Sequence, residues 1–284
     1  MNAFERSWEV TKASWAVLVQ DKELLLFPIF SVIFSGLFIV LMLFPVVILS
    51  ILHEVTNALT LPLYLTLFLL YFGVAFIATF FNVCVVYTTK TRFEGKNATL
   101  SESISFALSK SHLIFYWSLV AATVGLIIRI LENNARRGNN FMARIIVGMI
   151  GAAWSIATMF VVPSLVYHGY GPREAIEKSV QTIRKTWGEN LIAFFGFGFA
   201  QFAFILIGAA VFVPLFILSL VGGWMSIGLV VLLAVLYVVG VALVFGILKS
   251  IFHTALFVYA EKGKIPLGYK KEMLKTAFVK KASL

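Results

Sequence analysis

Six long apolar stretches constrain this chain more than any other feature of its sequence. Each is at least 19 residues long, and a helix needs about 20 apolar residues to cross the roughly 30 Å hydrocarbon core of a bilayer. A transmembrane barrel would instead show segments of about 10 residues that alternate in polarity, and the sequence has none. Membrane-spanning helices are therefore predicted at Leu24–Leu52, Leu61–Thr88, Leu113–Leu131, Ile145–Tyr167, Leu191–Leu220 and Trp224–Tyr259.

The composition argues against a water-soluble fold. Hydrophobic residues make up 61% of the chain and charged residues 13%, whereas soluble domains have about 45–50% and about 25%. A soluble core could not hide this much apolar surface, so lipid must be the solvent for most of the chain. The sequence predicts an all-α, polytopic membrane helix bundle that forms a single integral membrane domain over residues 1–284.

Lysine and arginine lie mainly on one side of the predicted spans. Eighteen fall in the N-terminal segment, the second and fourth connections and the C-terminal tail, whereas three fall in the connections on the other side. Cytoplasmic loops carry the excess of positive charge in membrane proteins. We therefore expect a multi-pass protein of the cytoplasmic (inner) membrane with both the N-terminus and the C-terminus inside.

The segments before the first, third and fifth spans resemble one another. Each places apolar side chains at helical spacing on one face and charged side chains on others, as amphipathic helices at a membrane interface do. Asn2 with Glu5, and Thr99 with Glu102, have the spacing of a helix-capping box. The apolar stripes are Phe4, Trp8, Thr11, Trp15 and Leu18; Ile104, Ala107, Leu108 and Ser111; and Ile176, Val180, Ile183 and Trp187.

These patterns predict a threefold arrangement in which an interfacial helix precedes each hairpin of two spans. The interfacial helices are expected at residues 1–23, 98–112 and 172–188, the hairpins at 24–88, 113–167 and 191–259, and a basic cytoplasmic tail at 260–284.

Four of the spans have features that predict an irregular helix. Pro28 and Pro45 in the first span, Pro163 in the fourth and Pro214 in the fifth are expected to kink or tilt these spans. The sixth span is longer than the membrane requires, and we expect it either to project into the cytoplasm or to break near Gly240 or Gly246.

Two short motifs near the N-terminus carry a family resemblance. Phe4-Glu5-Arg6-Ser7-Trp8 and the charged run from Asp21 to Pro28 (DKELLLFP) resemble an uncharacterised family of prokaryotic integral membrane proteins. The resemblance implies six membrane helices and no catalytic residues. More distantly, the three-hairpin layout is similar to the membrane domain that accompanies some glycerophosphodiester phosphodiesterases. The catalytic barrel of those enzymes is absent here, so no hydrolase activity is implied.

The placement of acidic residues disfavours several function classes. Asp21 and all glutamates lie outside the apolar spans or at their edges. Proton- and sodium-coupled carriers commonly use an intramembrane carboxylate, although carriers that coordinate ions through backbone carbonyls remain open. No GxSxG, HExxH, P-loop or dinucleotide fingerprint occurs. We therefore expect a protein that is not an enzyme, with no cofactor and no metal site.

One candidate polar site lies near the inner ends of the spans. Lys249 and His253 are four residues apart and share a helix face, and Asn82 lies at a comparable depth in the second span. Together they could bind an anionic headgroup or line a water-filled cavity. The alternative is that the sixth helix leaves the bilayer near residue 247, so that Lys249 extends to lipid phosphates.

A second set of residues is predicted to contact the lipid surface. Tryptophans favour the headgroup layer, and lysines near an anionic leaflet are attracted to it. Nucleic acid is not expected as a partner, because the orientation rule already explains the positive charge. The expected partners are the lipid bilayer, anionic lipids on the cytoplasmic face and a candidate protein partner or second copy. The contact residues are Trp8, Trp15, Trp187, Lys270, Lys271 and Lys275.

Taken together, these features predict a non-enzymatic membrane scaffold or lipid-interacting component. The alternative is a transporter or channel subunit for a small or amphiphilic solute.

Overall fold

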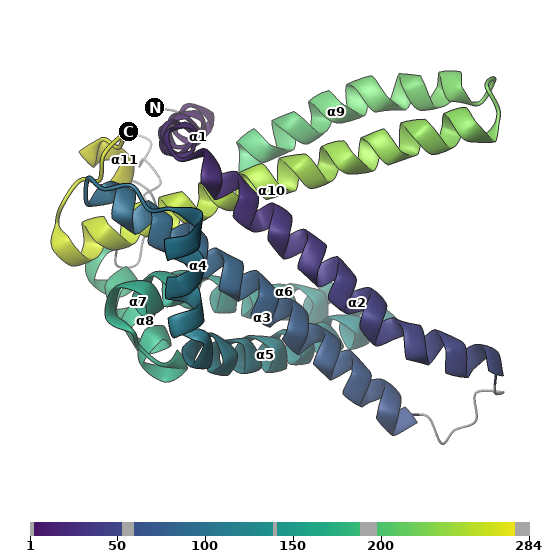
Figure 1. Cartoon of the computed structure of the whole chain (residues 1–284), viewed down its shortest axis with the longest axis horizontal. Helices are drawn as coiled ribbons and strands as arrows, with labels where there is room; N and C mark the ends of the chain where they lie inside the picture. The colour runs from purple at the N-terminus through teal and green to yellow at the C-terminus, as the bar shows by residue number, and fades with distance from the viewer. Residues whose placement is uncertain (1–2, 53–59, 139–140, 188–197, 276–284) are drawn as a thin grey trace. The chain divides into compact units, whose positions relative to one another are not determined.

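The structure is a computed structural model of the whole chain, and it describes residues 3–52, 60–138, 141–187 and 198–275. Within these ranges it consists of helices joined by turns and contains no strand, so the all-α prediction is confirmed. The helices (Figure 1) are α1 (Ala3–Gln20), the short 3-10 helix η1 (Lys22–Leu25), α2 (Leu26–Leu52), α3 (Thr60–Phe93), α4 (Leu100–Ser109), α5 (Ser111–Arg137), α6 (Phe141–Ala157), α7 (Val161–His168), α8 (Pro172–Trp187), α9 (Gly198–Ser219), α10 (Trp224–Lys262) and α11 (Lys271–Lys275).

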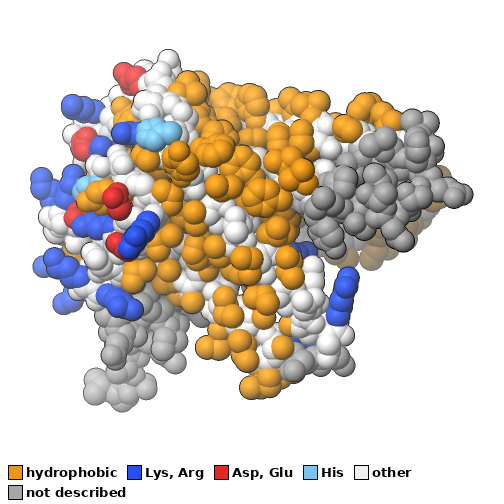
Figure 2. All heavy atoms as spheres, turned by 90° about the horizontal axis from the view of Figure 1, so that it is seen from below, with side chains coloured by type: hydrophobic (Ala, Val, Ile, Leu, Met, Phe, Trp, Pro, Cys, Tyr) orange, Lys and Arg blue, Asp and Glu red, His pale blue; other side chains and the backbone are white. Residues whose placement is uncertain are grey.

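Six helical segments of the described residues are long and apolar enough to cross a membrane. They coincide with the six predicted stretches, which confirms a polytopic helix bundle. The face drawn in Figure 2 is covered largely by hydrophobic side chains, and most of its charged side chains gather toward one end. Lipid accounts for such a surface, because hydrocarbon solvates exposed apolar side chains that water would not. The predicted start of the fifth span, Leu191, lies outside the described residues.

The chain divides into two compact units, and each is described by itself. One comprises Met1–Leu25 with Arg184–Leu284, and the other comprises Leu26–Ile183. The first unit therefore contains α1, η1, α9, α10 and α11, whereas the second contains the first two predicted hairpins and α4.

The fourth span is interrupted. Helix α6 ends at Ala157 and α7 begins at Val161, so the distortion expected at Pro163 takes the form of a break. Proline lacks an N–H and crowds the carbonyl one turn earlier, which favours a break here, whereas Pro45 of α2 and Pro214 of α9 lie within continuous helices. The Ser179 hydroxyl of α8 accepts a hydrogen bond from the Phe160 N–H at 3.1 Å and so satisfies a backbone donor at the break.

The sixth span is one continuous helix of 39 residues. The expected break at Gly240 or Gly246 is wrong, because glycine weakens a helix but keeps its N–H and its hydrogen bond. At 1.5 Å per residue the helix is about 58 Å long, well beyond the hydrocarbon thickness. The expected excess length is therefore present as unbroken helix, and many side chains between Phe245 and Val258 are buried.

The third hairpin is formed by α9 and α10, which lie side by side in Figure 1. Gly223 begins α10 in a left-handed conformation (φ +80°), as expected for the tight Val221-Gly222-Gly223 connection. Further along, Gly208 lies directly against the Tyr237 ring, where any side chain would overlap the ring. The Tyr237 hydroxyl donates to the Phe204 carbonyl at 2.6 Å, which fixes the ring in this position.

The second unit uses the same kinds of contact between its helices. Gly73 of α3 lies against the Phe38 ring of α2, again with no room for a side chain. The indole rings of Trp117 in α5 and Trp154 in α6 stack with their centroids 6.2 Å apart. Aromatic rings against glycine or against each other allow close helix packing where lipid removes the usual hydrophobic driving force.

The three predicted interfacial helices form as α1, α4 and α8, and each carries a wholly buried serine. Ser14 shares a hydrogen bond with the Tyr269 hydroxyl at 2.7 Å. Ser103 shares one with the Thr88 hydroxyl at 2.7 Å. Ser14 therefore helps to attach α1 together with the buried Val10, Val17 and Leu18, and Ser103 helps to attach α4 together with Ala107. The location of these helices in a membrane interface stays a prediction.

The capping prediction is confirmed for α4. The Thr99 hydroxyl accepts from the Glu102 N–H at 3.2 Å, and the Glu102 carboxylate accepts from the Thr99 N–H at 2.8 Å. Asn2, in the equivalent place before α1, lies outside the described residues.

The buried faces of α4 and α8 differ from the predicted stripes. In α4 the buried side chains are Ser103 and Ala107, whereas Leu108 is exposed. In α8, Ala175 packs against Trp117 and Val161. The buried sets overlap the predicted stripes at Ala107 and Ile183 and add the small residues Ser103 and Ala175, which close packing favours.

The contact between Gly208 and Tyr237 generates a first prediction. Gly208→Ala should destabilise the hairpin by about 1–3 kcal/mol, because the new methyl group displaces a ring held by its own hydrogen bond. Gly228→Ala in α10 is the matched control, since a methyl group there meets no atom within 4 Å. Thermal unfolding of both variants in the same detergent provides the measurement. An unchanged midpoint for Gly208→Ala would contradict the close approach.

The hydrogen bond between Ser14 and Tyr269 generates a second prediction. A double-mutant cycle with Ser14→Ala and Tyr269→Phe should give a coupling energy of about 1 kcal/mol, the usual value of a buried neutral hydrogen bond. Unfolding of the four proteins in detergent measures it. Strictly additive effects would show that α1 and the segment after α10 are not joined in this way.

Candidate functional site

An apolar groove lies between α1, α9 and α10, entirely within the first unit. Its volume is about 650 Å³, which falls within the range of about 300–1,000 Å³ found for ligand sites. The groove is lined by Trp8, Thr11, Lys12, Trp15, Phe204, Tyr237, Gly240, Val241, Val244, Phe245 and Leu248.

Helix α1 forms one wall of the groove. It has one face that is buried in the protein and an opposite face that lines the groove. Val10, Ser14 and Val17, spaced four and three residues apart, form a buried face. Trp8 and Trp15 lie on the opposite side at 40% and 48% exposure and line the groove. A helix turns 100° per residue, so these two sets cannot share a side. The first face attaches the helix, which leaves the second available for a ligand.

Helix α10 supplies the floor through residues at helical spacing. Tyr237, Val241, Val244 and Leu248 repeat every three or four residues on one side of the helix. Gly240 lies among them, and a side chain built there would meet no atom within 4 Å. The missing side chain therefore leaves open space in the groove.

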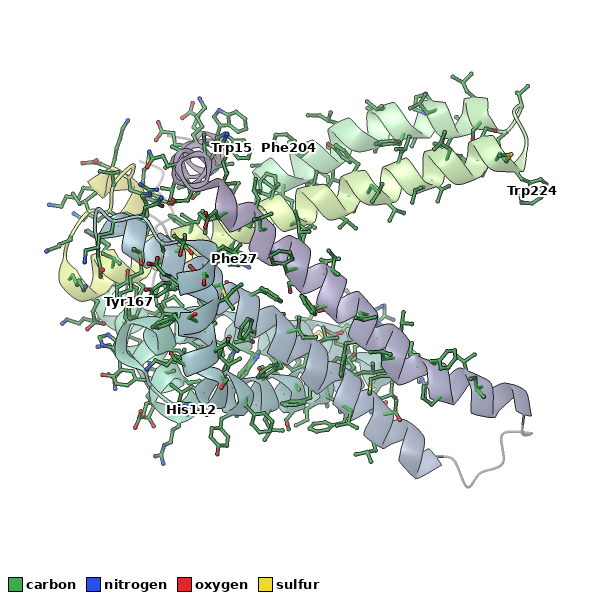
Figure 3. The ribbon with its side chains drawn as sticks, in the orientation of Figure 1. Trp15, Phe27, His112, Tyr167, Phe204 and Trp224 are labelled. Carbon is green, nitrogen blue, oxygen red and sulfur yellow. The ribbon has the colours of Figure 1, made fainter. Side chains whose placement is uncertain are left out.

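The groove interior is apolar. Its one hydroxyl on the floor, that of Tyr237, is already engaged with the Phe204 carbonyl. Within the described part of the chain, the lining contains one charged side chain, that of Lys12, which is exposed and has its Nζ 5.5 Å from the centroid of the Trp8 ring. Figure 3 shows Trp15 near Phe204 at one end of the hairpin and Trp224 at the other end. The groove thus combines an apolar interior with a cation at its rim.

Sequence reasoning identified part of this site. Trp8 and Trp15 were predicted as lipid-surface contacts, and the structure places both on the groove. The contribution of α10 was missed, because nothing in the local sequence indicates that residues 8–15 and 237–248 come together. The one sequence feature that could have indicated the groove is Gly240, which lies between the larger residues Tyr237 and Val241.

The predicted cluster of Asn82, Lys249 and His253 is placed only in part. Lys249 is exposed and His253 half-buried, one turn apart on α10. Asn82 is half-buried in α3, which belongs to the other unit. None of the three lines the groove. The cluster therefore stays a prediction, and the exposure of Lys249 agrees with the alternative that it extends to lipid phosphates.

The apolar side chains of the predicted basic tail are divided between the interior and the surface of the protein. Its helix, α11, has five residues, and the apolar Tyr269, Met273 and Leu274 are buried in the protein. Both α1 and α10 contact α11 and cover these side chains. Burial also raises the pKa of the Tyr269 hydroxyl above its usual range, so the group stays protonated and able to bond to Ser14. Tyr269, Met273 and Leu274 thus stabilise the fold, whereas Ile265 and Leu267 of the same tail are exposed.

The predicted lysine contacts remain at the surface. Lys270, Lys271 and Lys275 are all exposed, on the segment whose apolar side chains are buried. The side chain of Trp187, the remaining predicted contact, lies outside the described part of the structure, as do Ala277 and Phe278 of the tail.

A second cavity, of about 510 Å³, lies between α5 and α6 in the other unit. Its lining includes Glu132, Arg136 and Arg144, and Glu132 pairs with Arg129 at 3.5 Å. All three lining side chains are at least partly exposed, so solvent screens their charges.

Comparison with known proteins places the chain in a family but does not give it an activity. A family model described as a family of unknown function (DUF6159) matches residues 61–267. The match does not include the N-terminal motifs at Phe4–Trp8 and Asp21–Pro28. Searches of curated proteins and of solved structures found no match, and the comparisons give no support to a likeness with the membrane domain of glycerophosphodiester phosphodiesterases. Because the matched region covers well over half of the sequence, this multi-pass membrane protein belongs to the DUF6159 family of unknown function.

Proposed function

We propose that this protein is a non-enzymatic component of the cytoplasmic membrane that binds anionic lipid at the inner leaflet. The observation that carries the proposal is the exposed lysine surface formed by Lys270, Lys271 and Lys275. These lysines belong to a segment held by the burial of Tyr269, Met273 and Leu274. The burial of these three side chains therefore holds the charged lysines in place at the protein surface.

The charge distribution supports the orientation in this proposal. With both ends inside, 18 lysines and arginines face the cytoplasm and three face outward. The inner leaflet carries the anionic lipids that attract such residues. The lysine surface would then lie near the headgroups.

The tryptophans of α1 give independent support. Trp8 and Trp15 are large apolar side chains left about half exposed on a helix that otherwise packs well. Indole rings favour the boundary between headgroups and acyl chains, because one edge is polar and the rest apolar. Helix α1 and the lysine surface would thus contact the same leaflet.

The non-enzymatic part of the proposal rests on the sequence. No carboxylate lies within the apolar spans, and no catalytic fingerprint occurs. We assign the protein a binding role in which lipid is the ligand and not a substrate.

The lysine surface generates a third prediction. The triple variant Lys270→Gln, Lys271→Gln and Lys275→Gln should require at least about fivefold more phosphatidylglycerol to reach the same thermal stabilisation. Each lysine near an anionic surface contributes about this factor at low salt. The measurement is the unfolding midpoint of purified protein in nonionic detergent, titrated with phosphatidylglycerol or phosphatidylcholine.

The matched control changes the same three positions to arginine. This variant keeps the positive charge and should respond to phosphatidylglycerol as the native protein does. Salt at about 1 M should remove most of the difference between glutamine and arginine variants, because it screens charges beyond about 3 Å. Equal responses of both variants at low salt would overturn the proposal.

A further inference from the structure

We infer that the groove between α1, α9 and α10 binds one acyl chain of an anionic phospholipid, with the phosphate held at Lys12. This inference rests on the proposed lipid-binding function and names a specific site for it. The site is separate from the lysine surface at residues 270–275, so the two can be tested apart.

The interior of the groove matches an acyl chain and not a polar solute. Val241, Val244 and Leu248 offer only hydrocarbon, and the Tyr237 hydroxyl is engaged with a backbone carbonyl. A polar ligand would lose its hydrogen bonds to water without replacement, which is costly in an apolar setting. An alkyl chain has none to lose.

The rim supplies the charge that selects the headgroup. Among the described residues that line the groove, Lys12 alone is charged, and its exposed ammonium lies near the Trp8 ring. A phosphate at this position would gain a charge-assisted hydrogen bond. Trp15 flanks the same rim, at the boundary that indole rings favour. Apolar interior and cationic rim together match the two parts of one phospholipid molecule.

The groove is already formed in the structure, which contains no ligand. Ser14 and its neighbours attach α1 through the opposite face, so Trp8 and Trp15 are not needed to hold the helix. Gly240 keeps the floor open. A site that needs no rearrangement avoids the ordering cost of binding.

The inference is tested by a substitution that adds a side chain to the floor of the groove. Gly240→Leu places a side chain in the open space, and Gly246→Leu is the matched control on the same helix. A side chain at Gly246 also meets no atom within 4 Å, but this residue is outside the groove lining. Both changes replace a helical glycine, so their effects on helix propensity are equal.

Native mass spectrometry of the full-length protein in mild detergent, titrated with phosphatidylglycerol, measures the occupancy. The native protein and Gly246→Leu should retain one tightly bound phosphatidylglycerol. Gly240→Leu should weaken this binding at least tenfold, with an unfolding midpoint in lipid-free detergent like that of Gly246→Leu. Binding unaffected by Gly240→Leu, or weakened equally by both variants as expected for a non-specific lipid annulus, would overturn the inference.

The headgroup contact is tested with Lys12→Gln and Lys12→Arg. The glutamine variant should lose about fivefold in affinity for phosphatidylglycerol but not for phosphatidylcholine, and arginine should restore the preference. A preference unchanged by Lys12→Gln would overturn the role of Lys12. A mass increase by a second copy of the chain, lost in Gly240→Leu, would identify a protein occupant and overturn the lipid assignment.

The two lipid proposals fail in distinguishable ways. If the triple lysine variant loses its response while Gly240→Leu behaves as the control, the lysine surface stands and the groove site is wrong. If Gly240→Leu loses its bound lipid while the triple variant is unaffected, the groove site stands and the lysine surface is wrong.

Discussion

The absence of water from the bilayer core is the constraint on which this structure depends. An unpaired backbone N–H or C=O is costly there, so a spanning segment must satisfy its own hydrogen bonds as a helix. The fourth span shows what happens when it cannot. Pro163 interrupts the ladder, and the buried Phe160 N–H at the break donates to the Ser179 hydroxyl of α8. A helix outside the span thus compensates for a break within it.

A second consequence of lipid is that helices gain little by hiding apolar side chains from one another. Helices in lipid associate instead through close packing and hydrogen bonds between them, and both interactions favour small residues at the contact. Gly73 and Gly208 each accept an aromatic ring from the partner helix, while Ser14 and Ser103 bond to residues of neighbouring segments. Large apolar side chains lie both inside the protein, as Phe27, Phe160 and Phe257 do, and on its surface, where lipid solvates them.

Helix α1 connects this packing to the proposed function. Because Val10, Ser14 and Val17 attach it, Trp8 and Trp15 remain at the surface and form a groove with α10. The tail contributes in a similar way, since its buried Tyr269 and Leu274 leave its lysines outside. In both segments a buried apolar face positions exposed groups that are suited to lipid.

The sequence alone determined the features that depend on local composition and spacing. Long apolar runs gave the six spans, and the Thr99 and Glu102 pair marked the start of α4. The tertiary structure decided which distant segments meet. The repeat pattern predicted only that an interfacial helix precedes each hairpin in the chain, and the structure shows that α1 packs within its unit against the third hairpin and against Tyr269. The hydrogen bond between Ser14 and Tyr269, and the groove on the opposite face of α1, depend on contacts that no local pattern of hydrophobicity encodes.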